Sequence, residues 1–92
     1  MQQPIPPTGL NYKQLSASGL VKTGEGDLHM VKVSSSSSLT IKLWDNTAAS
    51  GTVIQATMAV AEKEEHYIPA HFGTGLYVEF VAGSGAVTVF FI

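Results

Sequence analysis

The sequence predicts an all-β fold, a small β-sandwich or jelly roll with an extended N-terminal arm. Two observations support this class: apolar and polar residues alternate over most of the chain, and clusters of Gly, Ser, Asn and Asp interrupt the alternation. A third is that no segment carries the helical period of about 3.6 residues. Together they indicate roughly six to eight short strands in one domain.

Residues 1–17 are predicted to form the arm. Their prolines fix an extended backbone and remove hydrogen-bond donors, which makes this segment a poor partner for a sheet. Apolar side chains are nevertheless spaced through it, namely Ile5, Leu10, Tyr12 and Leu15. Because disordered tails usually carry fewer apolar residues, two readings stay open: a loose terminus, or an arm that docks on a neighbouring subunit.

The domain, residues 18–92, opens with two apolar runs. Residues 19–23 and 28–33 flank a Gly-Glu-Gly-Asp turn, which predicts a first hairpin. The serines at positions 34–38 offer neither packing nor charge, so they are expected in an exposed loop or at a strand end. The clearest strand follows, in which Leu39, Ile41 and Leu43 point to one face and the intervening residues, with Trp44, to the other.

Turn formers and a proline organise the middle of the domain. Residues 45–51 are predicted to close a hairpin onto residues 52–60. The charge cluster at 61–65 is expected to be a solvated connection, because five residues between strands are too few for a stable helix. Residues 66–70 read as a short extended piece that Pro69 places at an edge or a strand end.

A final hairpin is predicted between residues 75–81 and 86–92, joined by a Gly-Ser-Gly turn. Both segments are apolar on two faces, whereas a lone sandwich alternates apolar inside with polar outside. Either the arm and sheet curvature cover the outer side chains within one subunit, or a second subunit or partner covers them. The candidate interface residues are Ile5, Leu10, Tyr12, Leu15, Trp44, Tyr77, Phe90 and Ile92.

Composition limits the function classes. With 13% charged residues and a formal net charge of −2, the chain offers no basic patch for nucleic acid or an anionic membrane. It has neither a long apolar span nor the basic and apolar regions of a signal peptide. Because cysteine is absent, disulfides cannot supplement the small core, so association with other chains is expected.

The residues that could carry chemistry are few. The histidines His29, His66 and His71 lie outside any metal-ligand motif such as His-Glu-x-x-His. No Gly-x-Ser-x-Gly elbow and no strand-to-helix phosphate loop is present. The sequence therefore predicts a protein that is not an enzyme, with no catalytic or metal-binding residues and no cofactor. A carbohydrate- or receptor-binding module is the alternative, with Trp44, Tyr67 and Tyr77 as a stacking platform.

Two blocks of the sequence resemble small virion proteins of tailed bacteriophages. GLVKTGEGDLHMVKV at 19–33 is similar to their opening hairpin, and WDNTAASGTVI at 44–54 to their x-D-N-T-x-A-S-G-T-V-I hairpin. A Gly-Leu strand start at 75–76 and Val-Thr-Val at 87–89 complete the likeness, which covers about residues 18–92.

The resemblance implies a non-enzymatic subunit that decorates or cements a capsid, as a dimer or trimer across capsomer junctions. Its partners would be the major capsid protein or other virion subunits, and its location the capsid surface after synthesis in the host cytoplasm. Residues 62–71 depart from the shorter linker of such proteins, which leaves the attachment site open. A tail or head–tail accessory protein would need similar features.

Overall fold

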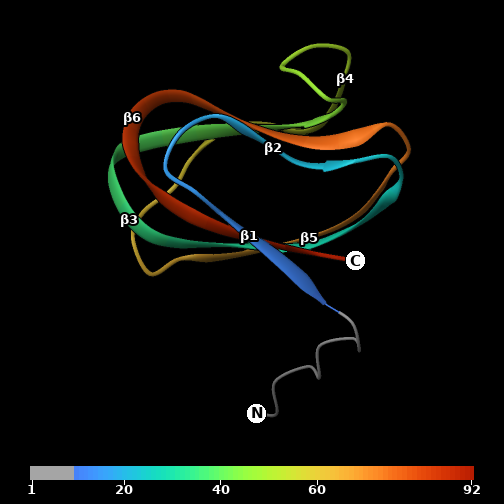
Figure 1. Cartoon of the computed structure of the whole chain (residues 1–92). Coiled ribbons are helices and arrows are strands. Elements are labelled where there is room, and N and C mark those ends of the chain that lie inside the picture. Colours follow the sequence, from blue (N-terminus) through green and yellow to red (C-terminus); the bar gives the residue numbers. More distant parts are fainter. Residues whose placement is uncertain (1–9) are drawn as a thin grey trace.

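The computed structural model describes residues 10–92 and confirms the all-β prediction. In this part of the chain, strands and turns form one continuous antiparallel sheet without a helix (Figure 1). The strands are β1 (Asn11–Leu15), β2 (Gly19–Thr23), β3 (Gly26–Asp45), β4 (Thr52–Ala59), β5 (Glu65–Phe72) and β6 (Gly75–Phe91).

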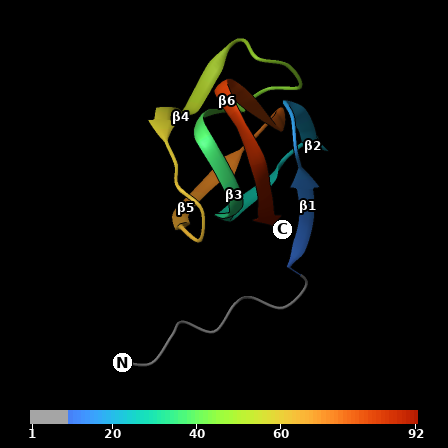
Figure 2. The same ribbon diagram turned by 90° about the vertical axis from the view of Figure 1, so that its left-hand side faces the viewer.

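The sheet folds over into two layers because β3 and β6 take part in both. The first part of β3 pairs with β5 and with the last part of β6, which also pairs with β1. We call this group the lower layer, as it lies in Figure 1. The last part of β3 pairs with β4 and with the first part of β6, which also pairs with β2, and this group is the upper layer. Figure 2 shows β4 and β5 on one side of the central pair, and β1 and β2 on the other. The arrangement is compatible with a small β-sandwich.

Both long strands cross between the layers at segments of small residues, 34–38 in β3 and 82–86 in β6 (left side of Figure 1). The segments are paired, with Ser36 opposite Gly85, and the register shifts on either side of this pairing. Register shifts of this kind bend a strand and increase its twist. Gly83 adopts a φ of 77°, a left-handed conformation that glycine reaches without a steric penalty.

The predicted final hairpin, between residues 75–81 and 86–92, is wrong. The Gly-Ser-Gly segment bends a single strand, so the two halves of β6 lie in different layers and both pair with β3. The predicted first hairpin, between residues 19–23 and 28–33, is also wrong, because β2 pairs with β6. Residues 34–38 likewise lie within β3 and not in a loop or at a strand end, although most of their side chains are exposed.

The middle of the chain follows the prediction. β3 and β4 form the expected hairpin around residues 45–51, and residues 60–64 connect β4 to β5 without a helix. Among the described strands, β5 pairs with β3 on one side, so Pro69 lies on an edge strand as expected for a residue without an N–H.

The core lies between the two layers and consists of the side chains that strand alternation directs inward. Leu39, Ile41 and Leu43 are fully buried, as predicted from their spacing. Their fully buried neighbours come from both layers and include Val31, Val33, Phe72, Leu76, Val78 and Val89. Removing this apolar surface from water, at about 25 cal/mol per Å², is the main favourable contribution to folding.

The predicted arm contributes a strand to the sheet of its own chain. Residues 11–15 form β1 and pair antiparallel with the last part of β6. Leu15 lies opposite Val87 and packs against the core, and Leu10 is half-buried. The sheet therefore begins at residue 11 and not at residue 18, while Ile5 lies outside the described residues.

Candidate functional site

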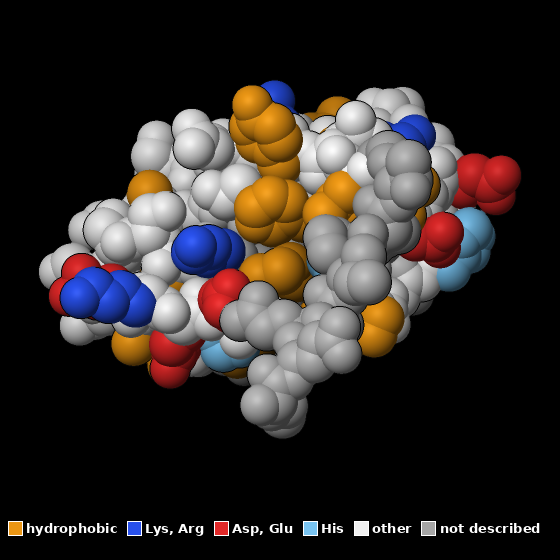
Figure 3. Space-filling model, turned by 90° about the horizontal axis from the view of Figure 1, so that it is seen from below, with side chains coloured by type: hydrophobic (Ala, Val, Ile, Leu, Met, Phe, Trp, Pro, Cys, Tyr) orange, Lys and Arg blue, Asp and Glu red, His pale blue; other side chains and the backbone are white. Residues whose placement is uncertain are grey.

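A row of apolar side chains crosses the outer face of the lower layer. Tyr12 on β1 lies opposite Phe90 on β6, and Phe90 lies opposite Met30 on β3. Met30 is in turn opposite Tyr67 on β5. Directly opposed residues of an antiparallel sheet point to the same face, so these four side chains form one stripe, which we call the lower stripe. Tyr12 is 68% exposed and Tyr67 is 53% exposed. Figure 3 shows this face, with hydrophobic side chains in a column across it.

Aromatic contacts order the lower stripe. The ring of His29 packs edge-on against Tyr67 with centroids 4.8 Å apart, and the Tyr67 hydroxyl lies 3.1 Å from His29 Nε2. At the other end of the stripe, the centroids of Tyr12 and Phe90 are 6.4 Å apart. Ile92, two positions beyond Phe90 along the chain, is 41% exposed. The stripe is thus a preformed apolar surface.

The upper layer carries a corresponding row on its own outer face. Leu20 lies opposite Tyr77, Tyr77 opposite Trp44, and Trp44 opposite Val53. We call this row the upper stripe. It crosses β2, β6, β3 and β4, and its side chains are half-buried except for Val53, which is 41% exposed.

Two charged side chains hold Trp44 in place. The indole Nε1–H donates a hydrogen bond to Glu79 Oε1 at 3.0 Å. The Lys42 Nζ lies 4.4 Å from the centre of the Trp44 ring, within the range of a cation–π contact. These contacts orient the indole, so the upper stripe is less free to rearrange than a row of simple aliphatic side chains.

The structure divides the predicted interface residues between opposite faces. Tyr12 and Phe90 belong to the lower stripe with Ile92 beside them, whereas Trp44 and Tyr77 belong to the upper stripe. One partner cannot contact all of these residues through a single flat surface. The predicted interface residues therefore lie on two candidate surfaces.

Sequence reasoning missed Met30, Leu20 and Val53, and it named Tyr67 only as part of the sugar-stacking platform. These four residues complete the two stripes. Met30 and Leu20 each lie beside a register shift, where simple alternation no longer assigns the correct face. Tyr67 lies in a regularly alternating strand, so its outward position could have been read from the sequence.

The proposed sugar-stacking platform of Trp44, Tyr67 and Tyr77 is wrong as a single site. Trp44 and Tyr77 are neighbours in the upper layer, but Tyr67 lies in the lower layer. Only the Trp44–Tyr77 pair remains as a possible surface for stacking a sugar.

The histidines make separate contacts and do not converge. His66 Nε2 lies 3.0 Å from Glu64 Oε1, and His71 Nδ1 lies 2.9 Å from Asp27 Oδ1. Within residues 10–92 no group of three or more His, Asp or Glu side chains is placed to hold a metal ion.

We expect His71 to titrate above the ordinary histidine pKa of 6.5. The hydrogen bond with Asp27 raises the pKa of His71 most, desolvation partly opposes it, and the charges of Asp27, Glu25 and Asp45 add to the increase. A folded pKa above the unfolded one means that this contact stabilises the fold below pH 6.5 and that the contribution is lost as the pH rises through the folded pKa. NMR titration of the ring should show the raised pKa, and Asp27→Asn should return it toward 6.5. An identical titration curve in both proteins would contradict this account.

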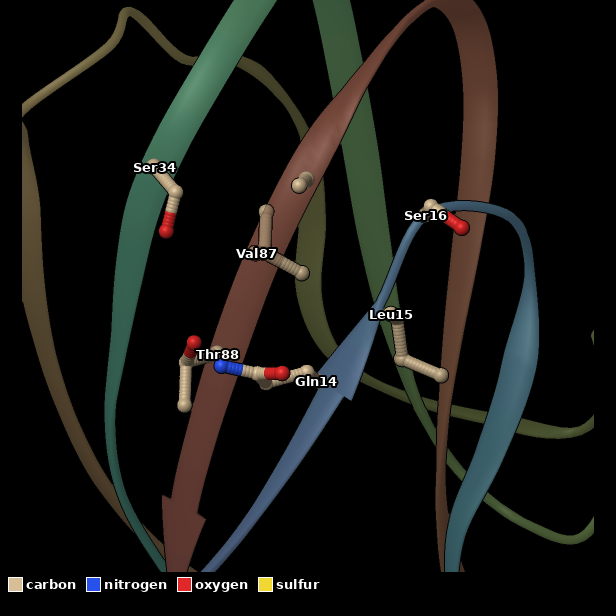
Figure 4. A pocket seen from close by; sticks show the side chains of 7 residues that line it. Gln14, Leu15, Ser16, Ser34, Val87 and Thr88 are labelled. Carbon is tan, nitrogen blue, oxygen red and sulfur yellow. The ribbon is translucent and has the colours of Figure 1, made fainter.

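A groove of about 430 Å³ lies beside the lower stripe, between β1, β6 and β3 (Figure 4). Its lining is uncharged and consists of Gln14, Leu15, Ser16, Ser34, Ala86, Val87 and Thr88. Hydroxyl and amide groups of this kind suit contact with a neutral polar side chain and lack an acid or base for catalysis. The groove therefore extends the contact surface of the lower layer.

Comparisons with known proteins add no relative. A scan against protein-family models and searches of curated proteins and of solved structures give no match. Within residues 10–92 no helix is long and apolar enough to cross a membrane.

Proposed function

We propose that this chain is a non-enzymatic structural protein of a phage virion, a decoration or cement subunit that stabilises the capsid by burying surface between coat subunits. The observation that supports this role is the pair of apolar stripes on opposite outer faces of one small domain. A subunit that joins neighbours needs two such surfaces, whereas a catalyst needs a cleft with converging polar groups.

The energetics favour a role in contact. Tyr12, Tyr67 and Val53 are exposed in the free chain, and their burial gains about 25 cal/mol per Å² of apolar area. The low content of charged residues, 13%, reduces the desolvation cost of covering these faces. Because the β-sheet is preformed, covering it orders little backbone, which lowers one of the entropic costs of association.

The proposal is tested by co-sedimentation with shells assembled from the coat protein of the same virion. We expect the chain to pellet with assembled shells and to leave free coat monomer in the supernatant. Shells that carry it should withstand heating better than bare shells. Trp44→Ala and Tyr67→Ala should each reduce binding if both stripes contact the assembly, because buried aromatic residues contribute most to interfaces.

Thr57→Ala on β4 is the matched control, since Thr57 is exposed and lies outside both stripes. The same co-sedimentation with isolated phage tails distinguishes a capsid subunit from a tail accessory protein. If the chain binds neither shells nor tails, the proposed function is wrong.

The Trp44–Tyr77 pair supports a second candidate, a carbohydrate-binding module. The indole is fixed by Glu79, and an oriented aromatic ring beside a carboxylate suits stacking and hydrogen bonding of a sugar. Binding to a glycan array that Trp44→Ala and Tyr77→Ala both abolish, without binding to shells, would favour this candidate over the first.

A further inference from the structure

Charged groups lie on both sides of the lower stripe. Three rows of paired residues on β3 and β5 cross this part of the outer face: Asp27 with His71, Met30 with Tyr67, and Lys32 with Glu65, with a register shift between the first row and the second. The four titratable residues of these rows are exposed. Figure 3 shows basic and acidic side chains next to each other on one side of the hydrophobic column, and acidic and histidine side chains beyond its other side. On one side of the stripe the acid of the row is on β3, and on the other side the base of the row is on β3.

We propose that the lower face binds a second copy of this chain, related by a two-fold axis that runs along the lower stripe. The inference rests on the proposed function, in which the apolar faces are contact surfaces. In a face-to-face dimer the axis lies in the plane of contact. A half-turn about this axis places the lower stripe of one copy against the lower stripe of the other. It also places each flanking row of one copy against the opposite flanking row of the other. Asp27 then faces Lys32 of the second copy, and His71 faces Glu65 of the second copy.

This pattern is self-complementary, which favours a second copy over an unrelated partner. Each exchanged pair joins groups that attract when both are charged, and the symmetry makes every such pair twice. Charges at the rim of an interface fix its orientation and speed association, while the apolar stripe supplies the affinity.

The edges of the lower layer also favour face-to-face contact. β5 carries Pro69, which cannot donate a hydrogen bond to an added strand, and β1 has only five residues. Both features weaken growth of the sheet by strand addition. Stacking of two sheet faces needs no free backbone groups and buries the stripe directly.

Sedimentation velocity over a concentration series at low ionic strength tests the proposal. We expect a concentration-dependent dimer. Asp27→Lys and Lys32→Asp should each weaken it about tenfold or more, because each variant brings like charges together. The double variant should restore dimerisation to within about threefold of the wild type, since it exchanges the two charges and keeps the pairing. Glu62→Lys, an exposed substitution in the connection between β4 and β5, should change little.

Cross-linking tests the orientation independently. The chain contains no cysteine, so any disulfide arises from an introduced thiol. A mixture of Asp27→Cys and Lys32→Cys proteins should form a disulfide-linked dimer faster than either protein alone, and Thr57→Cys should form none above background. Equal rates in the mixture and in the separate proteins would overturn the proposal, as would a chain that stays monomeric at all concentrations.

The two proposals can fail separately. A monomer that co-sediments with shells overturns the dimer and leaves the capsid role intact. A dimer with the expected charge dependence that binds no shells overturns the capsid role and leaves the dimer intact.

Discussion

Gly83→Ala should unfold the protein or lower its free energy of unfolding by about 3–5 kcal/mol. Gly83 has a φ of 77°, and an added Cβ would overlap the carbonyl oxygen of Ser38. The same Cβ would lie 2.5 Å from the Ser38 carbonyl carbon and 2.6 Å from the Ser37 oxygen. These are backbone atoms of the paired bend in β3, so no side-chain rotation can relieve the overlap. A domain of this size has a total stability of about 5–10 kcal/mol, which makes the loss severe.

Substitutions of two other glycines separate the steric overlap of the added Cβ from the cost of the positive φ. Gly73→Ala is the neutral control, because no atom lies within 4 Å of an added Cβ and its φ is not positive. Gly24→Ala tests backbone conformation alone: its φ is 88°, but the surrounding space is open, so a loss of about 1 kcal/mol is expected. Urea denaturation followed by circular dichroism gives all three values. If Gly83→Ala loses no more stability than Gly24→Ala, the bends of β3 and β6 do not approach each other as closely as described.

The bend also marks the limit of what the sequence could predict. A Gly-Ser-Gly segment between apolar runs indicates a positive φ and little side-chain packing, and both properties are present at Gly83. It does not indicate whether the chain reverses or continues into a second layer. That outcome depends on the serine segment, residues 34–38, which lies opposite in β3. The decisive contact joins segments more than 40 positions apart along the chain. The pattern within one segment carries no information about a pairing partner that distant.

Strand alternation nevertheless predicted which side chains face the core. Leu76 and Val78 are fully buried, and Tyr77 between them is outward as expected. Phe90 and Ile92 are outward for the same reason. Alternation assigns a face within one strand but not the register between strands, so the rows that form the two stripes could not be derived. The division of the candidate residues between two faces needed the pairing partners of β3 and β6.

Asp45→Ala should lower the free energy of unfolding by about 2–3 kcal/mol, the second largest effect expected here. Asp45 ends β3, and its carboxylate accepts backbone N–H hydrogen bonds from the turn between β5 and β6. The N–H groups of Gly73 and Thr74 lie 3.1 Å and 2.9 Å from Oδ1, and that of Gly75 lies 3.4 Å away. This turn carries the chain from the lower layer to the upper layer, so its loss of order affects both. Asp45→Asn should fall between the wild type and Asp45→Ala, because an amide keeps one acceptor oxygen and adds two donors.

The effect of Asp45 should depend on pH in a defined direction. The hydrogen bonds from Thr74 and Gly73 lower the pKa of Asp45 below its ordinary value of 3.8, outweighing the opposing desolvation. A lowered folded pKa means that the stabilisation is fully present above pH 3.8 and is lost as the pH falls through the folded pKa. The difference in stability between the wild type and Asp45→Asn should therefore be largest near about pH 5, where His71 is protonated and Asp45 is ionised, and shrink in more acidic solution. Urea denaturation at a series of pH values measures it, with Glu62→Gln as an exposed carboxylate control. A difference that stays constant into strong acid would show that Asp45 acts through its shape alone and that its charge does not hold the turn.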